Sequence, residues 1–170
     1  VTSLRTTLKK VKEIGYPAIQ ISGVGVQDPQ VIRELADEVG LIICATHEPS
    51  HKILEAPAEV VERLNILGCK HTAFPHPGSY AIDSREACLV LANKLESAGK
   101  ILFDGGKQLS YHNHELEFVR YADQSILELI LTNTDSKFLQ AELDTFWVQK
   151  GGEDPVEWCR KMKEIGRAHV

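Results

Sequence analysis

Hydrophobic residues along the chain follow two spacings that alternate from one end to the other. Segments with apolar residues three or four positions apart predict helices, and the short apolar runs between them predict strands. The predicted helices, counted from cap to stop, cover residues 3–14, 28–40, 57–68, 84–99, 125–131 and 154–166. The predicted strands cover residues 18–22, 41–45, 71–74, 108–112 and 138–143.

Proline and glycine mark where these helices begin and end. Aspartate followed by proline opens the second helix at 28–29 and the last helix at 154–155. Glycine stops four helices, at Gly15, Gly40, Gly68 and Gly166, and the long fourth helix is expected to break near Gly99. The repeated unit of strand and helix predicts an α/β fold with a parallel sheet and right-handed crossovers.

Two architectures are compatible with such a sheet: an open doubly wound sheet and an arc of a (β/α)8 barrel. A nucleotide-binding doubly wound sheet should carry a glycine-rich phosphate-binding turn after its first strand. The sequence SGVG at 22–25 has only two glycines of that turn and is weak evidence for it. The uninterrupted apolar run at 41–45 is typical of a strand that is buried on both faces.

Length and charge exclude several classes of protein. The chain has 170 residues and a formal net charge of −5, with no run of lysine or arginine, so a nucleic-acid partner is not expected. Its apolar runs are too short to span a membrane. Single cysteines are scattered through the sequence, and Cys88 and Cys159 fall on helical apolar stripes, which predicts buried thiols and a cytoplasmic setting.

The polar residues that could do chemistry follow the predicted strands. His47 and Glu48 come after the second strand and His76 after the third, while HNHE ends the fourth at 112–115 and ELD ends the fifth at 142–144. In a parallel α/β fold these positions gather at one rim, where active sites form. Imidazoles and carboxylates that meet there predict a divalent metal site.

Each of these residues also has a purely structural interpretation. His112 and His114 could be hydrogen-bonded structural residues, and Asp144 could cap a loop. Trp147 could form a wall of a substrate pocket or fill the core, whereas Trp158 lies within a helical pattern and is expected to pack.

At these motifs the sequence resembles a known family. The segments YHNHELEF at 111–118 and ELDTFWVQ at 142–149, followed by GG at 151–152 and DP at 154–155, resemble the sugar phosphate isomerase/epimerase family. The weaker segments ISGVG at 21–25 and ATH at 45–47 are similar to that family as well. The resemblance covers essentially the whole chain and implies a partial (β/α)8 TIM barrel of the xylose-isomerase-like type, with about five parallel strands and six helices.

The resemblance also implies a set of site residues. Family members hold manganese, magnesium or zinc with Glu, Asp, His and Glu from four late strands. Matched by motif, the metal ligands here are His112, which stands where many relatives carry Glu, and Asp144. His47 and His114 are then expected to contact the substrate, and Trp147 joins them as a pocket wall. Because His112 replaces the usual carboxylate base, Glu142 becomes the candidate for the catalytic base.

The implied activity is proton transfer next to the carbonyl of a sugar or sugar phosphate. The later His and Glu ligands have no counterpart, and His169 is better interpreted as a terminal residue. We therefore expect residues 1–170 to form one incomplete barrel domain, inactive alone, with weak or absent metal binding and with open sheet edges that favour a homo-oligomer. The alternatives are a non-catalytic sugar-binding or self-associating remnant and, less favoured, an abasic-site endonuclease relative.

Overall fold

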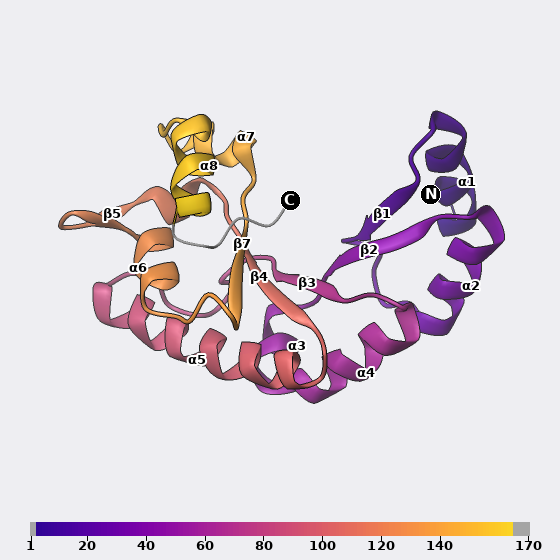
Figure 1. Cartoon of the computed structure of the whole chain (residues 1–170), viewed down its shortest axis with the longest axis horizontal. Helices are drawn as coiled ribbons and strands as arrows, with labels where there is room; N and C mark the ends of the chain where they lie inside the picture. Colours follow the sequence, from indigo (N-terminus) through magenta and orange to yellow (C-terminus); the bar gives the residue numbers. More distant parts are fainter. Residues whose placement is uncertain (1–2, 165–170) are drawn as a thin grey trace.

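The computed structural model describes residues 3–164 and contains one five-stranded parallel sheet (Figure 1). The strand order is β1-β2-β3-β4-β7, so strands of this sheet that are consecutive along the chain are also neighbours in the sheet. The predicted helix stop at Gly166 and the terminal His169 lie outside the described residues. The strands of the sheet are β1 (Ala18–Ile21), β2 (Ile42–His47), β3 (His71–Phe74), β4 (Gln108–His112) and β7 (Leu139–Glu142).

Helices connect the strands and cover the outer side of the sheet (Figure 1). A small hairpin, β5 (Arg120–Tyr121) with β6 (Gln124–Ser125), and the 3-10 helix η1 (Glu115–Phe118) lie between β4 and the next helix. The α-helices of the described residues are α1 (Leu4–Ile14), α2 (Pro29–Val39), α3 (Ser50–Glu55), α4 (Pro57–Leu67), α5 (Arg85–Asp104), α6 (Ile126–Thr132), α7 (Thr145–Lys150) and α8 (Pro155–Glu164).

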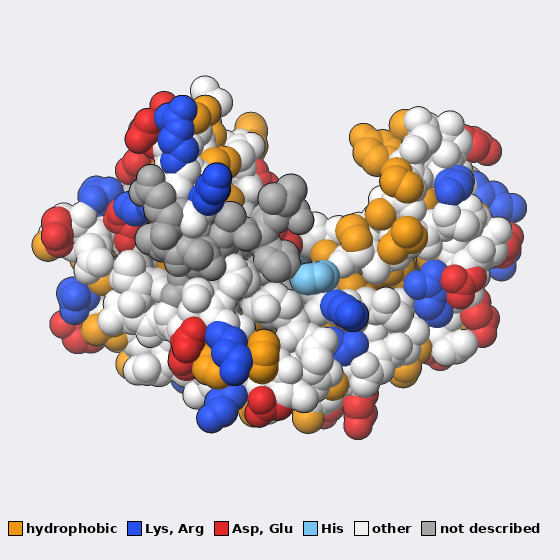
Figure 2. Space-filling view, in the orientation of Figure 1, with side chains coloured by type: hydrophobic (Ala, Val, Ile, Leu, Met, Phe, Trp, Pro, Cys, Tyr) orange, Lys and Arg blue, Asp and Glu red, His pale blue; other side chains and the backbone are white. Residues whose placement is uncertain are grey.

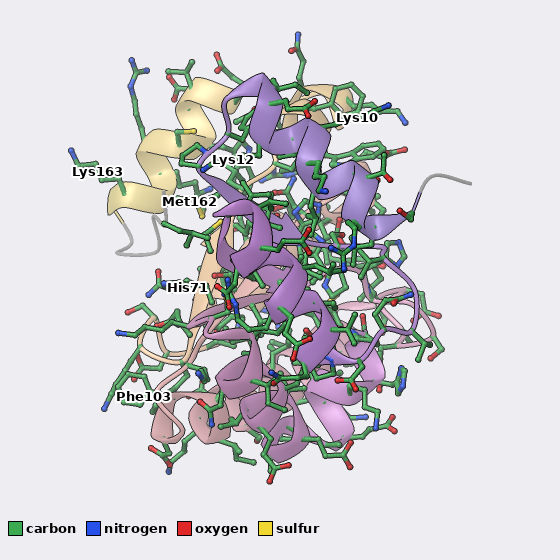
Figure 3. The ribbon with its side chains drawn as sticks, turned by 90° about the vertical axis from the view of Figure 1, so that its right-hand side faces the viewer. Lys10, Lys12, His71, Phe103, Met162 and Lys163 are labelled. Atoms are coloured by element: carbon green, nitrogen blue, oxygen red, sulfur yellow. The ribbon has the colours of Figure 1, made fainter. Side chains whose placement is uncertain are left out.

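The capping signals of the sequence operate as predicted. The Asp28 side chain accepts a hydrogen bond from the backbone N–H of Gln30 at the start of α2, and proline occupies its first turn. The helix ends at Gly40, whose φ of 69° is a left-handed conformation that glycine adopts without strain. Lys12 (labelled in Figure 3) donates a hydrogen bond to the Gly40 carbonyl at 2.7 Å and so ties α1 to the end of α2.

Two predictions about helices are wrong. Helix α5 continues through Gly99, where a Cβ would lie 2.3 Å from the Phe138 carbonyl oxygen. In α8 the side chain of Cys159 is exposed although it was predicted to be buried, while Trp158 is buried as expected. The buried stripe of α8 is formed by Trp158 and Met162, which are four residues apart and therefore share a face.

The prediction that the 41–45 strand is buried on both faces is also wrong. Ile43 on β2 is 2% exposed and belongs to the core, but its neighbour Ile42 is 64% exposed. The core therefore lies between the sheet and the helices, and the opposite face of β2 is open. In the space-filling view, hydrophobic side chains follow the inner side of the hollow on the arm that contains β1 and β2 (Figure 2).

The sheet curves into an arc with the strands inside and the helices outside (Figure 1). The β1 and β7 strands are four positions apart, which is about 19 Å in a flat sheet. Gln20 on β1 nevertheless donates hydrogen bonds to both carboxylate oxygens of Glu142 on β7, at 3.0 and 3.1 Å. This contact between opposite edges of the sheet requires barrel-like curvature, as the sequence motifs predicted. No helix in the described part of the chain is long and apolar enough to cross a membrane.

Candidate metal centre

Glu142 is the point on which the polar side chains of the concave face converge. Its strand places it at the carboxyl end of β7, directly paired with His112 on β4. The Nε2 atom of His47, at the end of β2, lies 2.7 Å from Glu142 Oε1, and Gln20 reaches the same carboxylate from β1. Side chains from both edges and from the middle of the sheet thus meet at one carboxylate because the sheet is curved.

The ring of His112 lies between two carboxylates. Its Nδ1 atom is 3.2 Å from Glu142 Oε1, and its Nε2 atom is 3.9 Å from Asp144 Oδ2. The Nδ1 atom is buried and forms no hydrogen bond with any described residue. A metal ion that binds one nitrogen of this ring can take only the carboxylate on that side. His112 with Glu142 and His112 with Asp144 are therefore alternative ligand pairs for a single ion.

Ser22 sets the orientation of His47. The Nδ1 atom of His47 lies 3.1 Å from the Ser22 hydroxyl, and its Nε2 atom lies against Glu142. A carboxylate can only accept, so Nε2 carries a proton in the metal-free state, and in the neutral ring Nδ1 then accepts from Ser22. On binding a cation through Nε2, the ring would shift its proton to Nδ1 and donate to the Ser22 oxygen. This is the outer hydrogen bond that ligating histidines usually make.

Glu142 remains ionised in this environment. Burial raises the pKa of its carboxyl group, but the imidazoles of His112 and His47 and the amide of Gln20 together lower that pKa far below its ordinary value. The result is a partly buried carboxylate that carries its negative charge at any physiological pH. An ionised carboxylate and neutral imidazoles are the forms that a divalent cation requires of its ligands.

The donor set fits a divalent cation. His47, His112 and Glu142 each offer a ligand atom, and these atoms all lie within 4.8 Å of one another. In a tetrahedral site with bonds near 2.1 Å the ligand atoms are about 3.4 Å apart. The observed contacts of 2.7 and 3.2 Å to Glu142 are slightly shorter, so small outward movements would create the cradle. Three protein ligands leave a position open for a substrate oxygen.

A row of aromatic rings extends from this cluster along the rim. The ring centroids of His112 and His114 are 5.0 Å apart, and His114 in turn lies 5.1 Å from Trp147 and 5.2 Å from His76. Burial, followed by the nearby His112 and His76, lowers the pKa of His114. Its Nδ1 atom is buried and forms no hydrogen bond with a described residue.

The two carboxylate oxygens of Asp144 contact different groups. It is the N-cap of α7, where Oδ1 accepts hydrogen bonds from the backbone N–H groups of Phe146 and Trp147. Its other oxygen, Oδ2, is directed at His112. The capping interpretation of Asp144 is therefore confirmed, and the cap leaves one oxygen of the carboxylate available to a ligand.

A cavity of about 680 Å³ adjoins the cluster at His47, a size typical of small-molecule sites. The turn that contains Gly23 and Gly25, both with positive φ, forms part of its wall. Glu48 also lines this cavity, but it is buried and its carboxylate lies 3.1 Å from Arg63 Nε on α4. Glu48 thus serves as a structural ion-pair partner.

The structure brings all the residues predicted for the site into one group at the carboxyl ends of the strands. Gln20 and Ser22 were not predicted, because neither an amide nor a hydroxyl on an early strand is a signal for a metal site. Only the alternation of side chains along β1, which directs Gln20 to the concave face, could have indicated that Gln20 belongs to the site. The predicted residues in the group are His47, His112, His114, Glu142, Asp144 and Trp147.

Comparison with known proteins shows which fold this is. The sequence matches no family model and no curated protein. A sugar phosphate isomerase/epimerase from Parabacteroides distasonis has a TM-score of 0.84 and 23% identity over 97% of this chain and 67% of that protein. An AP endonuclease of family 2 from Brucella melitensis has a TM-score of 0.74 and 13% identity over 95% of this chain and 70% of that protein. The 3-keto-D-glucoside 4-epimerase of E. coli has a TM-score of 0.69 and 15% identity, with 95% and 70% covered.

These likenesses establish the fold of the chain. It is the fold of the xylose-isomerase-like TIM barrel, a name that another matching structure carries. The chain spans about two thirds of the length of the sugar phosphate isomerase/epimerase that it matches. The fold that the motifs predicted is confirmed, with eight α-helices in the described residues where six were expected.

Proposed function

We propose that this chain carries the metal site of a sugar isomerase or epimerase that transfers a proton next to a carbonyl group. The observation that supports the proposal most directly is the convergence of His47 and His112 on the ionised carboxylate of Glu142. This cluster lies at the carboxyl ends of the strands, where enzymes with this fold carry their active sites. The structural neighbours include a sugar phosphate isomerase/epimerase and a 3-keto-D-glucoside 4-epimerase, which have the same fold.

The residues of the site have separate tasks in this proposal. His47, His112 and Glu142 hold manganese, magnesium or zinc, and the cation polarises the carbonyl and hydroxyl oxygens of a bound sugar. The ring of His114 lies between His112 and Trp147 on the rim, where a bound sugar would contact it. The ring of Trp147 provides an apolar surface for the sugar beside His114.

Glu142 and Asp144 each have a second possible role. A general base works best with a pKa near the working pH, and the low pKa of Glu142 makes it a weaker base than an ordinary glutamate. We therefore assign Glu142 to the cation, and its role as the catalytic base stays a prediction. Asp144 becomes a ligand in its place if the cation binds the other nitrogen of His112.

The 170-residue chain alone should bind the cation weakly and turn over sugars poorly. The described residues bring three ligand groups together, and the family resemblance implies four. The substrate class is a sugar or a sugar phosphate. The free cysteines, of which Cys44 and Cys159 are exposed, are consistent with the reducing cytoplasm that we propose as its location.

The proposal is tested by titrating the chain with Mn²⁺ in a calorimeter. We expect one ion per chain, and the His112→Ala variant should bind it about tenfold more weakly or worse. His51→Ala is the matched control, because His51 is an exposed histidine on α3. Failure of the wild-type chain to take up Mn²⁺, or unchanged binding by His112→Ala, would contradict the proposal.

A non-catalytic sugar-binding module is the alternative from a different class. It predicts that a sugar binds equally well with and without Mn²⁺, and that no deuterium from D₂O enters the sugar next to its carbonyl. The proposed function predicts slow, Mn²⁺-dependent deuterium incorporation, which nuclear magnetic resonance of the recovered sugar detects.

An endonuclease function is less well supported, although one neighbour is an AP endonuclease. A DNA-binding groove needs lysine and arginine side chains that are free to contact phosphates. Near the site, Lys150 lies 3.0 Å from Glu115, and Arg63 is paired with Glu48. The net charge of −5 also opposes binding to DNA.

A further inference from the structure

Asn113 connects the two strand ends on which the proposed metal site is built. The last backbone pair between β4 and β7 is His112 with Glu142, and the strands separate beyond it. Asn113 follows His112 directly, and its side chain is completely buried. Side chains alternate along an extended segment, so Asn113 is directed away from the face that carries His112 and His114.

The Asn113 amide forms a two-point contact with the backbone of Asp144. Its Nδ2 atom donates to the Asp144 carbonyl at 3.2 Å, and its Oδ1 atom accepts from the Asp144 N–H at 2.9 Å. Two paired residues of neighbouring strands exchange N–H and C=O hydrogen bonds in the same way. Here the Asn113 side chain takes the place of one of the two backbones. Of the common side chains, only an amide offers a donor and an acceptor in this arrangement.

The contact fixes more than one residue of the site. Because the Asp144 backbone is held, its carboxylate is placed with Oδ1 on the first N–H groups of α7 and Oδ2 towards His112. The same contact keeps the ends of β4 and β7 together just beyond His112 and Glu142, which are two of the proposed ligands. The position of Trp147 on the first turn of α7 depends on it as well.

We propose that Asn113 is a positioning residue that sets the spacing of the metal-binding side chains without touching the cation. The inference rests on the proposed function for its metal, but the contact itself is a property of the metal-free chain. Residues that hold metal ligands in place typically change metal affinity by about 10- to 100-fold when they are replaced.

The test compares Asn113→Ala with Thr72→Val. Thr72 is equally buried and donates to the Thr46 carbonyl at 3.2 Å, on the side of the sheet away from the cluster, so both variants lose buried hydrogen bonds. We expect Asn113→Ala to bind Mn²⁺ about 10- to 100-fold more weakly than wild type, and Thr72→Val to bind within about twofold of it. Equal affinities of wild type and folded Asn113→Ala, or equal losses in both variants, would overturn the proposal.

A second measurement does not depend on the variants folding or on the metal. In the wild-type, metal-free chain, the Asp144 amide should exchange with D₂O much more slowly than the amide of Glu115, a half-exposed residue, because Asn113 Oδ1 accepts the Asp144 hydrogen. Exchange of Asp144 as fast as that of Glu115 overturns the positioning role. If Asp144 is protected but the wild-type chain takes up no Mn²⁺, the proposed function fails and the contact stands as a structural one.

Discussion

At the scale of single residues, Glu142 determines what the cluster can do. Gln20 and His47 donate to its carboxylate, and His112 lies beside it, so that its negative charge is retained in a partly buried position. A carboxylate that is surrounded by donors binds protons weakly but remains available to a cation that displaces those donors. The low proton affinity of Glu142 therefore supports our proposal that it binds a cation instead of transferring a proton itself.

The substitution Glu142→Gln separates the two roles of this residue. Loss of a charged ligand should weaken Mn²⁺ binding by about tenfold or more, since a neutral amide is a poor ligand for a hard cation. Glu115→Gln is the matched control, because Glu115 is paired with Lys150 on the rim. Calorimetric titration measures both variants. If Glu142→Gln binds Mn²⁺ as tightly as wild type does, Glu142 is not a ligand and the base role becomes the better assignment.

The sequence alone predicted the residues that carry charge or imidazole groups, because these follow strands in recognisable motifs. It could not predict Gln20, whose importance arises only when the curved sheet brings β1 against β7. Nor could it assign a role to Asn113, which lies inside a recognised motif but acts through the backbone of a distant residue. The side chains that were predicted are therefore those whose residue type alone suggests metal or proton chemistry. Those that were missed matter only because of where the fold places them.

At the scale of elements, the 3-10 helix η1 supports the segment that carries the histidines. Glu117 is completely buried, accepts a hydrogen bond from the backbone N–H of His114 at 2.7 Å, and accepts another from the Tyr111 hydroxyl at 3.0 Å. Burial raises the pKa of Glu117 above its ordinary value, against the lowering effect of these hydrogen bonds. The buried carboxyl group therefore holds its proton more tightly in the folded chain than in the unfolded chain.

The raised pKa of Glu117 makes the stability of the protein depend on pH in a definite direction. Because the pKa is raised on folding, the contribution of Glu117 is fully present below the unfolded pKa and is lost as the pH rises through the folded pKa. Glu117→Gln removes this titration but keeps one acceptor and the shape. We expect wild type to lose stability relative to Glu117→Gln as the pH is raised from about 4 to about 7. Urea unfolding at several pH values measures this difference, and a difference that does not change with pH would contradict the expectation.

The contact between α5 and the residue before β7 gives a second prediction for the elements. Alanine in place of glycine inside a helix normally stabilises it by about 1 kcal/mol. At Gly99 the new Cβ would lie 2.3 Å from the Phe138 carbonyl oxygen, so the backbone must move. We expect Gly99→Ala to lower the free energy of unfolding by roughly 1–3 kcal/mol, because the steric cost exceeds the gain in propensity. Urea denaturation measures the change, and a stabilised variant would show that the two segments are not in contact.

Elements were predicted well where capping signals and a long apolar stripe coincide, as in α2 and α4. The six-residue helices α3 and α7 and the β5–β6 hairpin were missed. A helix of fewer than two turns has no measurable periodicity, and tertiary contacts decide whether it forms. The break expected in α5 does not occur for a related reason. Gly99 allows α5 to pack closely against the backbone of Phe138, and it does not end the helix.

At the scale of the whole molecule, the arc leaves apolar surface and strand edges open. Within the described residues, β1 is paired only with β2, and β7 only with β4. The concave face of β2 exposes Ile42 and Cys44. Unpaired strand edges and exposed apolar faces promote association. We therefore propose that copies of the 170-residue chain associate through this face.

Sedimentation velocity tests the association. We expect wild type to sediment as a dimer or a larger species, and Ile42→Lys to shift it towards monomer because a charge is then placed on the concave face. Val90→Lys is the control, since Val90 is similarly exposed but lies on the outer helix α5. A wild-type chain that sediments as a single monomeric species would contradict the proposal.

The central claim is that imidazoles from β2 and β4 bind the same cation. Nuclear magnetic resonance of the histidine side-chain nitrogens during a Zn²⁺ titration tests it most directly. We predict that the signals of His47 and His112 change together, with the same dependence on the Zn²⁺ concentration, while the signal of His51 is unaffected. If only one of the two rings responds, or if neither does, the proposed metal centre does not exist.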